Sequence, residues 1–570
     1  MGQETGEPTQ IGQRIIAIAL PVVAIAMVVY QLAFTQYLIQ DPTGHRITHL
    51  GLALTVVFLS LMLTDKKGWH LKLSLLVASV VTTGYFMYYL TPILEYRSAM
   101  PLTSDLVFGA LVIVLAFAGS YLIFGKTFPI VAAAFVAYMV LGRYIPPPFT
   151  VAAVSLKRLL MWLSASVGTD EGVYGDILGL SANYLFLFIF FGSLLHTLGG
   201  TRFIMGAGQW LGSKLRSGPA AVAVVGSSLL GTITGSTVAN ITITGAFTIP
   251  LMKKAGYEPQ QAGAIEAASS NGGQIMPPIM GATAFVMAGY SGIPYIKIVI
   301  AAILPAILYY FGVFLYVQLS AYKMNVIDIT EPVSGRKLLL DAPLFFIPLA
   351  LLVFLLSKGF TLPWVAFWSM MTLIVVALIS NVLRSVRGRK LLLAALPLFP
   401  ALAVLVFLLG QGVAWRWIAL WSMMTLIAVA LINNVVIKEA RPTLKGAIDG
   451  VTRGARTASE MAVVTALIGV VATNIKVSGL GIKLPLVIQD ISHGILFIAL
   501  LIAMVSSILL GMGVPTVVAY LLVAIGAVPA LRAMGVPLLQ AHFFPFIFAV
   551  FSHLTPPVAI GALVASQLAG

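Results

Sequence analysis

The sequence predicts an all-α integral membrane protein with about 14 membrane crossings and two re-entrant hairpins. Hydrophobic residues make up 60% of the 570 residues and charged residues only 9%, whereas soluble domains average about 45–50% and about 25%. Apolar runs recur at the length of about 20 residues that a helix needs to cross the hydrocarbon. A soluble enzyme, a disordered chain and, because cysteine is absent, a disulfide-stapled secreted domain are therefore excluded.

Twelve segments are expected to be full spans. The first is too long for the core of a signal peptide and has no small-residue cleavage site after it, so we expect it to be retained. The full spans are expected at residues 15–40, 47–64, 73–93, 106–125, 128–144, 178–197, 294–319, 338–356, 362–383, 391–410, 415–437 and 458–476.

Four further apolar segments are interrupted. Residues 259–290 and 537–568 are long enough to cross but carry Pro-Pro in the middle, which predicts broken helices. Residues 218–251 and 495–531 each have two apolar arms of about 15 residues around a centre rich in Gly, Thr and Ser. Because each arm is too short to cross, these two segments are expected to form half-depth hairpins.

The distribution of basic residues predicts a cytoplasmic amino terminus. When the loops are assigned alternately from that start, Lys and Arg divide into 22 inside and 11 outside. This bias is typical of membrane proteins, whose cytoplasmic loops are enriched in basic residues. The net charge of +15 is thus explained by topology, and no nucleic-acid partner is expected.

Residues 337–389 are followed by a tandem copy at 390–442, offset by 53 residues. The string WSMMTLI, for example, occurs at Trp368 and again at Trp421. Each copy holds two predicted spans, so the duplication leaves the orientation of the later chain unchanged. We expect it to belong to the scaffold.

A second, more distant repeat relates the interrupted segments. GTITGSTVAN from Gly231 is echoed by GMGVPTVVAY from Gly511, and GGQIMPPIMGA from Gly272 by FSHLTPPVAIGA from Phe551. The repeated units are expected at about 178–290 and 458–568. Seven predicted crossings separate the two hairpins, and because seven is odd the second unit enters from the opposite face. This predicts an inverted-topology pair, the architecture of many secondary transporters.

The interrupted segments are the candidate binding site. Non-helical backbone within the hydrocarbon survives only where it lines a protein cavity or holds an ion, and each Pro-Pro frees carbonyls of the preceding turn. With nearby neutral oxygens, these suit a hard cation. The expected cation ligands are Thr234, Gly235, Ser236, Thr237, Ser270, Asn271, Gly272, Gly273, Gln274, Gly511, Gly513, Pro515, Thr516, Ser552 and Thr555.

An anionic substrate is expected between these ligands, because the amino ends of half-helices point positive dipole ends at it. The expected substrate contacts are Ser236, Asn240, Asn271, Gln274, Pro277, Pro278, Thr516, Pro556 and Pro557. The alternative for any one motif is simple helix packing, since Gly231 and Gly235 fit the small-xxx-small pattern.

Two ionisable residues stand out. Glu266 lies in the first broken helix, where it is either a functional or proton-relay residue or a structural partner for backbone near the inner interface. His553 aligns with Gln274 through the repeat, and the seven histidines show no metal-binding spacing. Nucleotide-binding, zinc-protease and cysteine-pair motifs are absent, so neither catalysis nor direct use of ATP is expected.

At TDEGVYG (169–175), GTITGSTVAN (231–240) and SSNGGQIMPPIMGATAF (269–285) the chain resembles the fused membrane subunits of tripartite ATP-independent periplasmic (TRAP) transporters, of the type paired with TAXI-like receptors. The resemblance implies a small four-span subunit at 1–125 and a large transport subunit at 126–570. It also implies an elevator mechanism, Na⁺ coupling, uptake of an organic acid, a separate periplasmic solute receptor, and a bacterial or archaeal cytoplasmic membrane.

We therefore expect Na⁺-driven import of a carboxylate-bearing solute delivered by that receptor. The first alternative is a receptor-independent organic-anion carrier or a cation/proton antiporter of similar fold. The second is a non-transporting subunit of a membrane complex, because the chain ends soon after the second Pro-Pro segment whereas the family usually continues for further spans.

Overall fold

The computed structural model describes residues 10–37, 40–65, 67–152, 154–165, 167–324, 333–385 and 441–570. In this part of the chain the regular structure is helical and contains no β-strand, which confirms the all-α prediction. Within the described residues, ten helices are long and apolar enough to cross a membrane. Nine coincide with predicted spans. The tenth, Thr516–Ala533, is an arm of the second predicted hairpin and is longer than expected.

The first five predicted spans are α1 (Gln10–Tyr37), α2 (Pro42–Thr64), α3 (Trp69–Tyr88), α5 (Thr103–Phe124) and α6 (Thr127–Leu141). Asp41 caps α2 by accepting hydrogen bonds from the amides of Thr43 and Gly44, and Pro42 occupies the first position of the helix. A carboxylate at this end stabilises the helix because it meets the unpaired amides of the first turn.

The sixth span is continuous over residues 176–200 but contains two π-helical turns. It consists of α8 (Asp176–Leu180), α9 (Phe186–Leu195) and the π turns that follow each, and it bends at Gly199, whose φ is 112°. Two further helices, α10 (Thr201–Gly212) and α23 (Leu480–Ser492), each precede one of the predicted hairpins in the chain.

The first predicted hairpin turns back on itself at Gly235. Helix α11 (Gly218–Thr234) ends at this residue, whose φ of 56° favours glycine. Ser236 then caps α12 (Thr237–Asn240), and the chain returns through a π turn into α13 (Ala246–Lys254), which packs against α11.

The second hairpin repeats this plan. Helix α24 (Leu496–Gly511) is followed by a short turn in which Gly513 has a φ of 77°. The chain then enters α25 (Thr516–Ala533), which packs along α24. The two hairpins predicted from the sequence are thus both present.

Both Pro-Pro segments are broken helices, as predicted. In the first unit α14 (Pro259–Asn271) passes into a 3₁₀ turn, and helix resumes only at α15 (Ala282–Ser291). In the second unit α26 (Leu538–Phe551) is likewise followed by a 3₁₀ turn, and helix resumes at α27 (Ile560–Ala569). The bonds Pro277-Pro278 and Pro556-Pro557 are both cis.

The remaining described spans are α16 (Tyr295–Met324), α17 (Gly335–Ser357) and α18 (Leu362–Ser385). Helices α17 and α18 pack together and form the first copy of the tandem duplication; α17 also contacts α10, and α18 contacts α9. The second copy, with the spans predicted at 391–410 and 415–437, lies outside the described residues.

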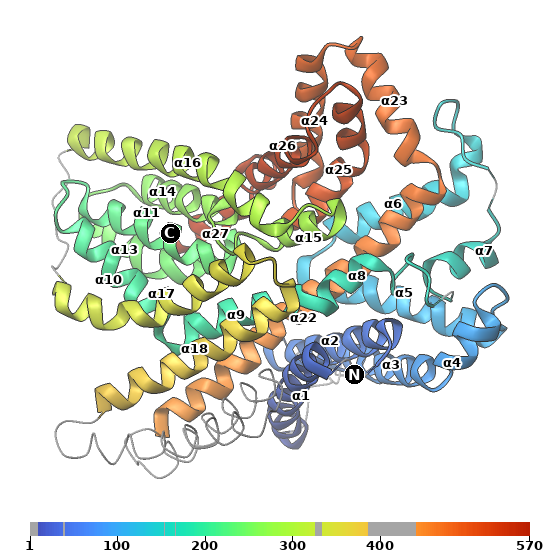
Figure 1. Cartoon of the computed structure of the whole chain (residues 1–570), viewed down its shortest axis with the longest axis horizontal. Helices are drawn as coiled ribbons and strands as arrows, with labels where there is room; N and C mark the ends of the chain where they lie inside the picture. Colours follow the sequence, from blue (N-terminus) through green and yellow to red (C-terminus); the bar gives the residue numbers. More distant parts are fainter. Residues whose placement is uncertain are drawn as a thin grey trace, which may run out of the picture.

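Helix α22 (Arg441–Val477) runs through the centre of the fold, where Figure 1 shows it in orange. It packs against α1, α2, α5, α6 and α9. Its inward face carries small and branched apolar residues such as Ala458, Ala462 and Val470, which are fully buried. It begins well before the span predicted at 458–476, because helix continues through the polar residues that precede the apolar run.

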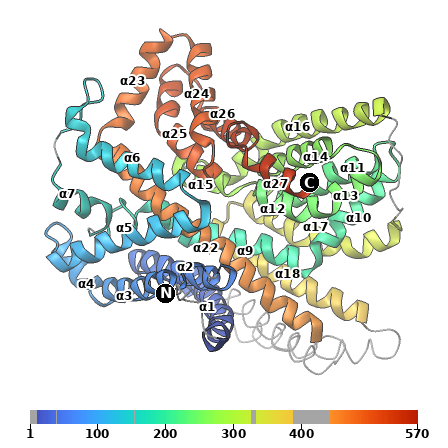
Figure 2. The same ribbon diagram turned by 180° about the vertical axis from the view of Figure 1, so that it is seen from behind.

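Helices of the two repeat units pack against each other. Helix α14 of the first unit packs against α27 of the second, and Figure 2 shows α12 beside α27 from behind. In Figure 1 the first hairpin (α11, α13) lies to the left and the second (α24, α25) at the top, so the two hairpins approach the centre from different sides.

The predicted opposite orientation of the two hairpins implies that their bases are labelled from opposite sides of the membrane. Lys254 ends α13 and Arg532 lies at the end of α25, and both are exposed. In this cysteine-free chain we expect a membrane-impermeant maleimide added outside intact cells to label the Arg532→Cys variant, and to label the Lys254→Cys variant only after permeabilisation. Labelling of both variants from the same side would contradict the inverted arrangement.

Candidate functional site

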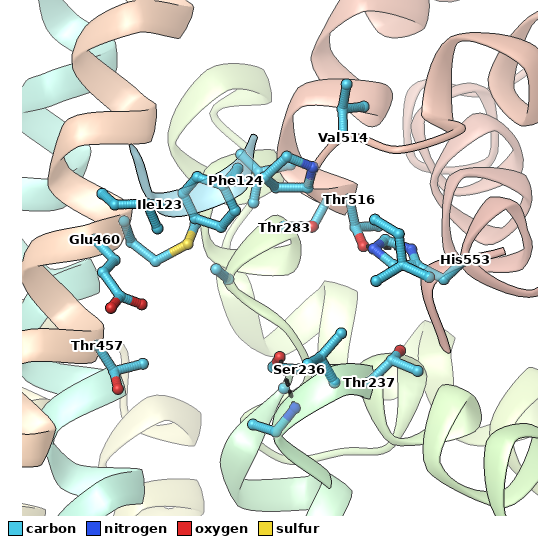
Figure 3. A pocket seen from close by; sticks show the side chains of 18 of the residues that line it. Ile123, Phe124, Ser236, Thr237, Thr283, Thr457, Glu460, Val514, Thr516 and His553 are labelled. Atoms are coloured by element: carbon cyan, nitrogen blue, oxygen red, sulfur yellow. Dashed lines mark hydrogen bonds between the residues drawn. The ribbon is translucent and has the colours of Figure 1, made fainter. Parts of the chain in front are cut away.

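The interruptions of the two units meet at one cavity of about 580 Å³. Its lining includes residues 235–239 at the tip of the first hairpin and 513–517 at the tip of the second. The broken helices add Gln274 and Thr283 from the first unit and His553 from the second. Figure 3 shows Ser236 and Thr237 facing Thr516 and His553 across this space.

A hydrogen-bonded chain centred on Gln274 joins the two units. The Gln274 Nε2 donates to Thr237 Oγ1 at 2.6 Å, and Thr516 Oγ1 donates to Gln274 Oε1 at 2.6 Å. Thr237 Oγ1 in turn donates to Asn271 Oδ1 at 2.9 Å, and the Nδ1 of His553 lies 3.3 Å from Thr516 Oγ1. Gln274 is only 3% exposed, so its side-chain amide needs partners within the protein. These hydrogen bonds give it one at the oxygen and one at the nitrogen.

The glycines beside this chain allow backbones to touch. A Cβ added to Gly273 would lie 2.5 Å from the Cα of Gly231, and one added to Gly511 would lie 2.5 Å from the Cβ of Ser552. Real Cβ atoms do not approach other atoms this closely. The hairpin position of this crossing is glycine in both units, Gly231 in the first and Gly511 in the second, because hairpin and broken helix cross there in contact.

The predicted cation ligands of the first unit are brought only partly together. Thr237, Asn271 and Gln274 meet as described above, whereas Ser270 points away to Glu266. The remaining side-chain oxygens and glycines make local contacts: Thr234 Oγ1 donates to the carbonyl of Leu230, Ser236 Oγ accepts from the amide of Ala239, Gly235 lies against Met280, and Gly272 lies against Tyr309.

In the second unit the predicted ligands lie around the hairpin tip. Thr516 lines the cavity, and Pro515 precedes it at the start of α25. The hydroxyls of Ser552 and Thr555 donate to the carbonyls of Ala549 and Phe551 in their own helix, at 2.7 and 2.9 Å. The same oxygens keep lone pairs, so this arrangement is compatible with cation ligation.

The carbonyls around the first Pro-Pro accept hydrogen bonds within the protein. The carbonyl of Gly273 accepts from the amide of Met276 at 3.2 Å, and that of Gln274 from the amide of Gly281 at 3.0 Å. The Tyr295 hydroxyl lies 3.0 and 2.5 Å from the carbonyls of residues 278 and 279. Internal partners thus hold the break together, and each carbonyl keeps a second lone pair.

Of the predicted substrate contacts, Ser236, Gln274 and Thr516 line the cavity. Asn240 and Asn271 are fully buried behind it. The four prolines Pro277, Pro278, Pro556 and Pro557 are not part of the lining, and the last two are exposed elsewhere. They shape the breaks and do not face this space.

The opposite wall of the cavity comes from residues that the sequence did not identify as part of the site. Helix α22 contributes Arg456, Thr457 and Glu460, and apolar residues come from the ends of α2 and α5. The Arg456 Nε donates to Glu460 Oε1 at 3.0 Å. Arg456 is one of the basic residues that the alternating loop assignment places on the cytoplasmic side. The available signal was its spacing of four residues from Glu460, which places both on one helix face.

Glu266 is fully buried behind the first hairpin. Its carboxylate accepts hydrogen bonds from the side-chain hydroxyls of Ser227, Thr244, Thr248 and Ser270. Among the described residues no group of three or more His, Cys, Asp or Glu side chains is placed to hold a metal ion.

The fold and the cavity define a multi-pass all-α membrane protein built around two discontinuous helical repeats. Residues 111–570 match the family "Tripartite ATP-independent periplasmic transporter, DctM component", and the chain belongs to this family. It is a family of transporter components and not of enzymes. The match begins within α5, before the subunit boundary predicted at 125, which stays a prediction.

Two curated relatives resemble parts of the chain. An "Uncharacterized protein YgiK" from Salmonella typhimurium is 26% identical over 224 residues, 39% of this chain and 51% of that protein. An "Uncharacterized protein y4mL" from Sinorhizobium fredii is 35% identical over 95 residues, 17% of this chain and 22% of that protein. The chain thus spans about half the length of one relative and less of the other.

The close crossing of Gly231 and Gly273 predicts that a methyl group added at either residue destabilises the fold. We expect Gly273→Ala to lower the free energy of unfolding by about 1–3 kcal/mol, the usual cost of overpacking, because its Cβ meets the Cα of Gly231. Thermal unfolding of the purified protein in detergent measures this. The control is Gly312→Ala in α16, where an added Cβ meets nothing within 4 Å. Equal melting temperatures for the two variants would contradict the close crossing.

Proposed function

We propose that this protein takes up an organic acid by Na⁺-coupled secondary transport, with the solute delivered by a separate periplasmic receptor. The observation that carries the proposal is the cavity between the hairpin tips of the two units. Its volume of about 580 Å³ falls in the range of about 300–1,000 Å³ typical of small-molecule sites. Membership of the TRAP family supports the receptor and a location in the bacterial inner membrane.

Two features of the cavity favour an anionic solute. The guanidinium of Arg456 lies in the wall formed by α22, and a guanidinium binds carboxylates with charge-assisted hydrogen bonds. The amino end of α25 begins at Thr516 in the facing wall, where the unpaired amides of the first turn carry partial positive charge. A carboxylate between these groups would meet positive potential on two sides.

Neutral oxygens beside the cavity favour Na⁺ as the coupling ion. In the first unit they belong to Thr237, Asn271 and Gln274, which already lie within hydrogen-bonding distance of one another. In the second unit they belong to Thr516, Ser552 and Thr555. Hydroxyl, amide and carbonyl oxygens are the ligands that hard cations prefer.

The composition of the walls supports an elevator mechanism. One wall consists of the hairpins and broken helices, and the other of α2, α5 and α22. We propose that the first set moves with the solute and that the second set, which includes the small-subunit-like residues 1–125, stays fixed. Solute delivery by a TAXI-like receptor belongs to the same proposal.

The test is uptake into proteoliposomes. The purified full chain is reconstituted with and without candidate receptors, and a panel of labelled organic acids is offered under an imposed Na⁺ gradient. We expect accumulation that needs both the gradient and a receptor. Accumulation without Na⁺ would remove the coupling, and accumulation without any receptor would favour the receptor-independent carrier.

Substitution of Arg456 tests where the anion binds. We expect Arg456→Ala to raise the half-saturation concentration for the transported acid roughly 10–100-fold, because a hydrogen bond to a charged group contributes about 1.5–3 kcal/mol. The control is Arg453→Ala on the same helix, an exposed residue whose Nε bonds the carbonyl of Asp449.

A further variant separates solute binding from the ion pair with Glu460. Arg456→Ala combined with Glu460→Gln leaves no unpaired carboxylate in the cavity wall. If Arg456 binds the solute, the double variant keeps the raised half-saturation concentration of Arg456→Ala alone. Recovery of the wild-type half-saturation concentration would show that Arg456 only neutralises Glu460.

A further inference from the structure

Glu266 lies inside a cage of hydroxyl groups. On α14 it is 0% exposed. Its Oε1 accepts from Ser227 Oγ of α11 at 3.0 Å, from Thr244 Oγ1 at 2.5 Å and from Ser270 Oγ at 2.8 Å. Its Oε2 accepts from Thr248 Oγ1 of α13 at 2.5 Å. Both arms of the first hairpin and the first broken helix thus converge on one carboxylate.

No cation balances this carboxylate among the residues that the structure describes, because none of the ion pairs found there includes Glu266. A buried carboxylate without a counter-ion is costly, and more so in a membrane. Hydroxyl dipoles offset part of that cost but leave the net charge in place.

The cage also holds more oxygen contacts than its hydrogens can fill. The four hydroxyls provide four hydrogens. Besides the carboxylate, Thr244 Oγ1 lies 2.8 Å from the carbonyl of Asn240 and 3.0 Å from Ser227 Oγ, and Thr248 Oγ1 lies 3.0 Å from the carbonyl of Thr244. Some of these contacts therefore share a hydrogen or lack one, and a positive ion among the oxygens would stabilise such an arrangement.

The spacing of the cage residues along their helices brings them onto common faces. Thr244 and Thr248 are four residues apart, as are Glu266 and Ser270, so each pair lies on one helix face. Thr244 lies in the π turn at residues 241–245, and π turns occur frequently at functional sites. Adding the spacing between the two Pro-Pro motifs to 266 gives Pro545, so the second unit has no counterpart of the carboxylate.

The cage is connected to the cavity. Asn240 Nδ2 donates to the carbonyls of Ser227 and Ser270, at 2.9 and 3.3 Å. The next residue after Ser270 is Asn271, which accepts from Thr237 at the hairpin tip. An ion that orders the cage therefore also orders the wall of the cavity.

We propose that Glu266, with the hydroxyls of Ser227, Thr244, Thr248 and Ser270, forms a binding site for one Na⁺ ion behind the first hairpin. The hydroxyls turn their hydrogens outward and present lone pairs to the ion, and the carboxylate supplies the compensating charge. This site is separate from the neutral ligands at the hairpin tips. It rests on the Na⁺ coupling proposed above and names its charged ligand.

The experiment measures Na⁺ binding without any solute. The melting temperature of the purified full chain in nanodiscs is followed against NaCl concentration, with choline chloride keeping the ionic strength constant. Wild-type protein is expected to show a saturable rise, because an ion that binds only the folded state stabilises it.

Two cage variants and one control variant test whether the cage itself binds the Na⁺. Ser227→Ala is expected to raise the Na⁺ concentration needed for the half-maximal rise in melting temperature by at least about 10–100-fold. Loss of a supporting contact at a metal site lowers the affinity for the metal by that factor. Glu266→Gln is expected to lose the part of the response that comes from the cage, so that at most the part due to the hairpin-tip ligands remains. Without Na⁺ this variant is expected to melt above wild-type protein without Na⁺, because the uncompensated charge is gone. The control is Thr242→Val, whose exposed hydroxyl bonds only the carbonyl of Val238 in the same turn, and which is expected to respond as wild type.

The outcomes separate this site from the transport proposal. If the two cage variants bind Na⁺ as wild type does while uptake stays Na⁺-dependent, the cage is not the site but the coupling stands. If wild-type protein shows no Na⁺ response and uptake is Na⁺-independent, both fail. A melting temperature that depends on pH and not on Na⁺ would overturn the cation site as well. If Glu266→Gln does not fold, Ser227→Ala gives the answer.

Discussion

The contact between the backbones of Gly231 and Gly273 is the constraint on which the centre of this protein depends. It lets the first hairpin lie directly on the first broken helix, and it places Gln274 within reach of Thr237 on one side and Thr516 on the other. Within a membrane, chain that leaves the helix must find its hydrogen-bond partners inside the protein. At the first break the carbonyls find such partners within the unit, while the Gln274 side-chain amide pairs with one hydroxyl of each unit and so joins them.

Charge is distributed unevenly around the cavity. The hairpin tips present neutral hydroxyl and amide groups, whereas the charged pair Arg456 and Glu460 lies on α22, in the wall we propose to be fixed. Carrying an unpaired charge through the hydrocarbon is expensive. A moving set whose hairpin tips are neutral, and whose buried carboxylate Glu266 is balanced by a bound ion, suits the proposed elevator better than one with unpaired charges in the cavity wall.

Much of the architecture could be predicted because its signals are local. Pro277 and Pro556 mark the broken helices directly, and the Gly-rich centres mark both hairpins. The scaffold wall was missed because Arg456 lies in a basic stretch that reads as a cytoplasmic flank, although α22 is already helical there. The cage was missed because Thr242, Thr244 and Thr248 all lie in one arm and nothing in the sequence distinguishes those that face Glu266; only tertiary packing brings Thr244 and Thr248 to it.

The central claim is that the two units converge on one site, and a cross-link tests it most directly. A Cβ added to Gly561 of the second unit would lie 3.1 Å from Thr237 Cγ2 of the first, within reach of a disulfide. In this cysteine-free chain, the variant combining Thr237→Cys with Gly561→Cys is oxidised mildly, digested and analysed by mass spectrometry without reduction. The account predicts a linked peptide that joins both units. Two free thiols that a maleimide labels separately would contradict it.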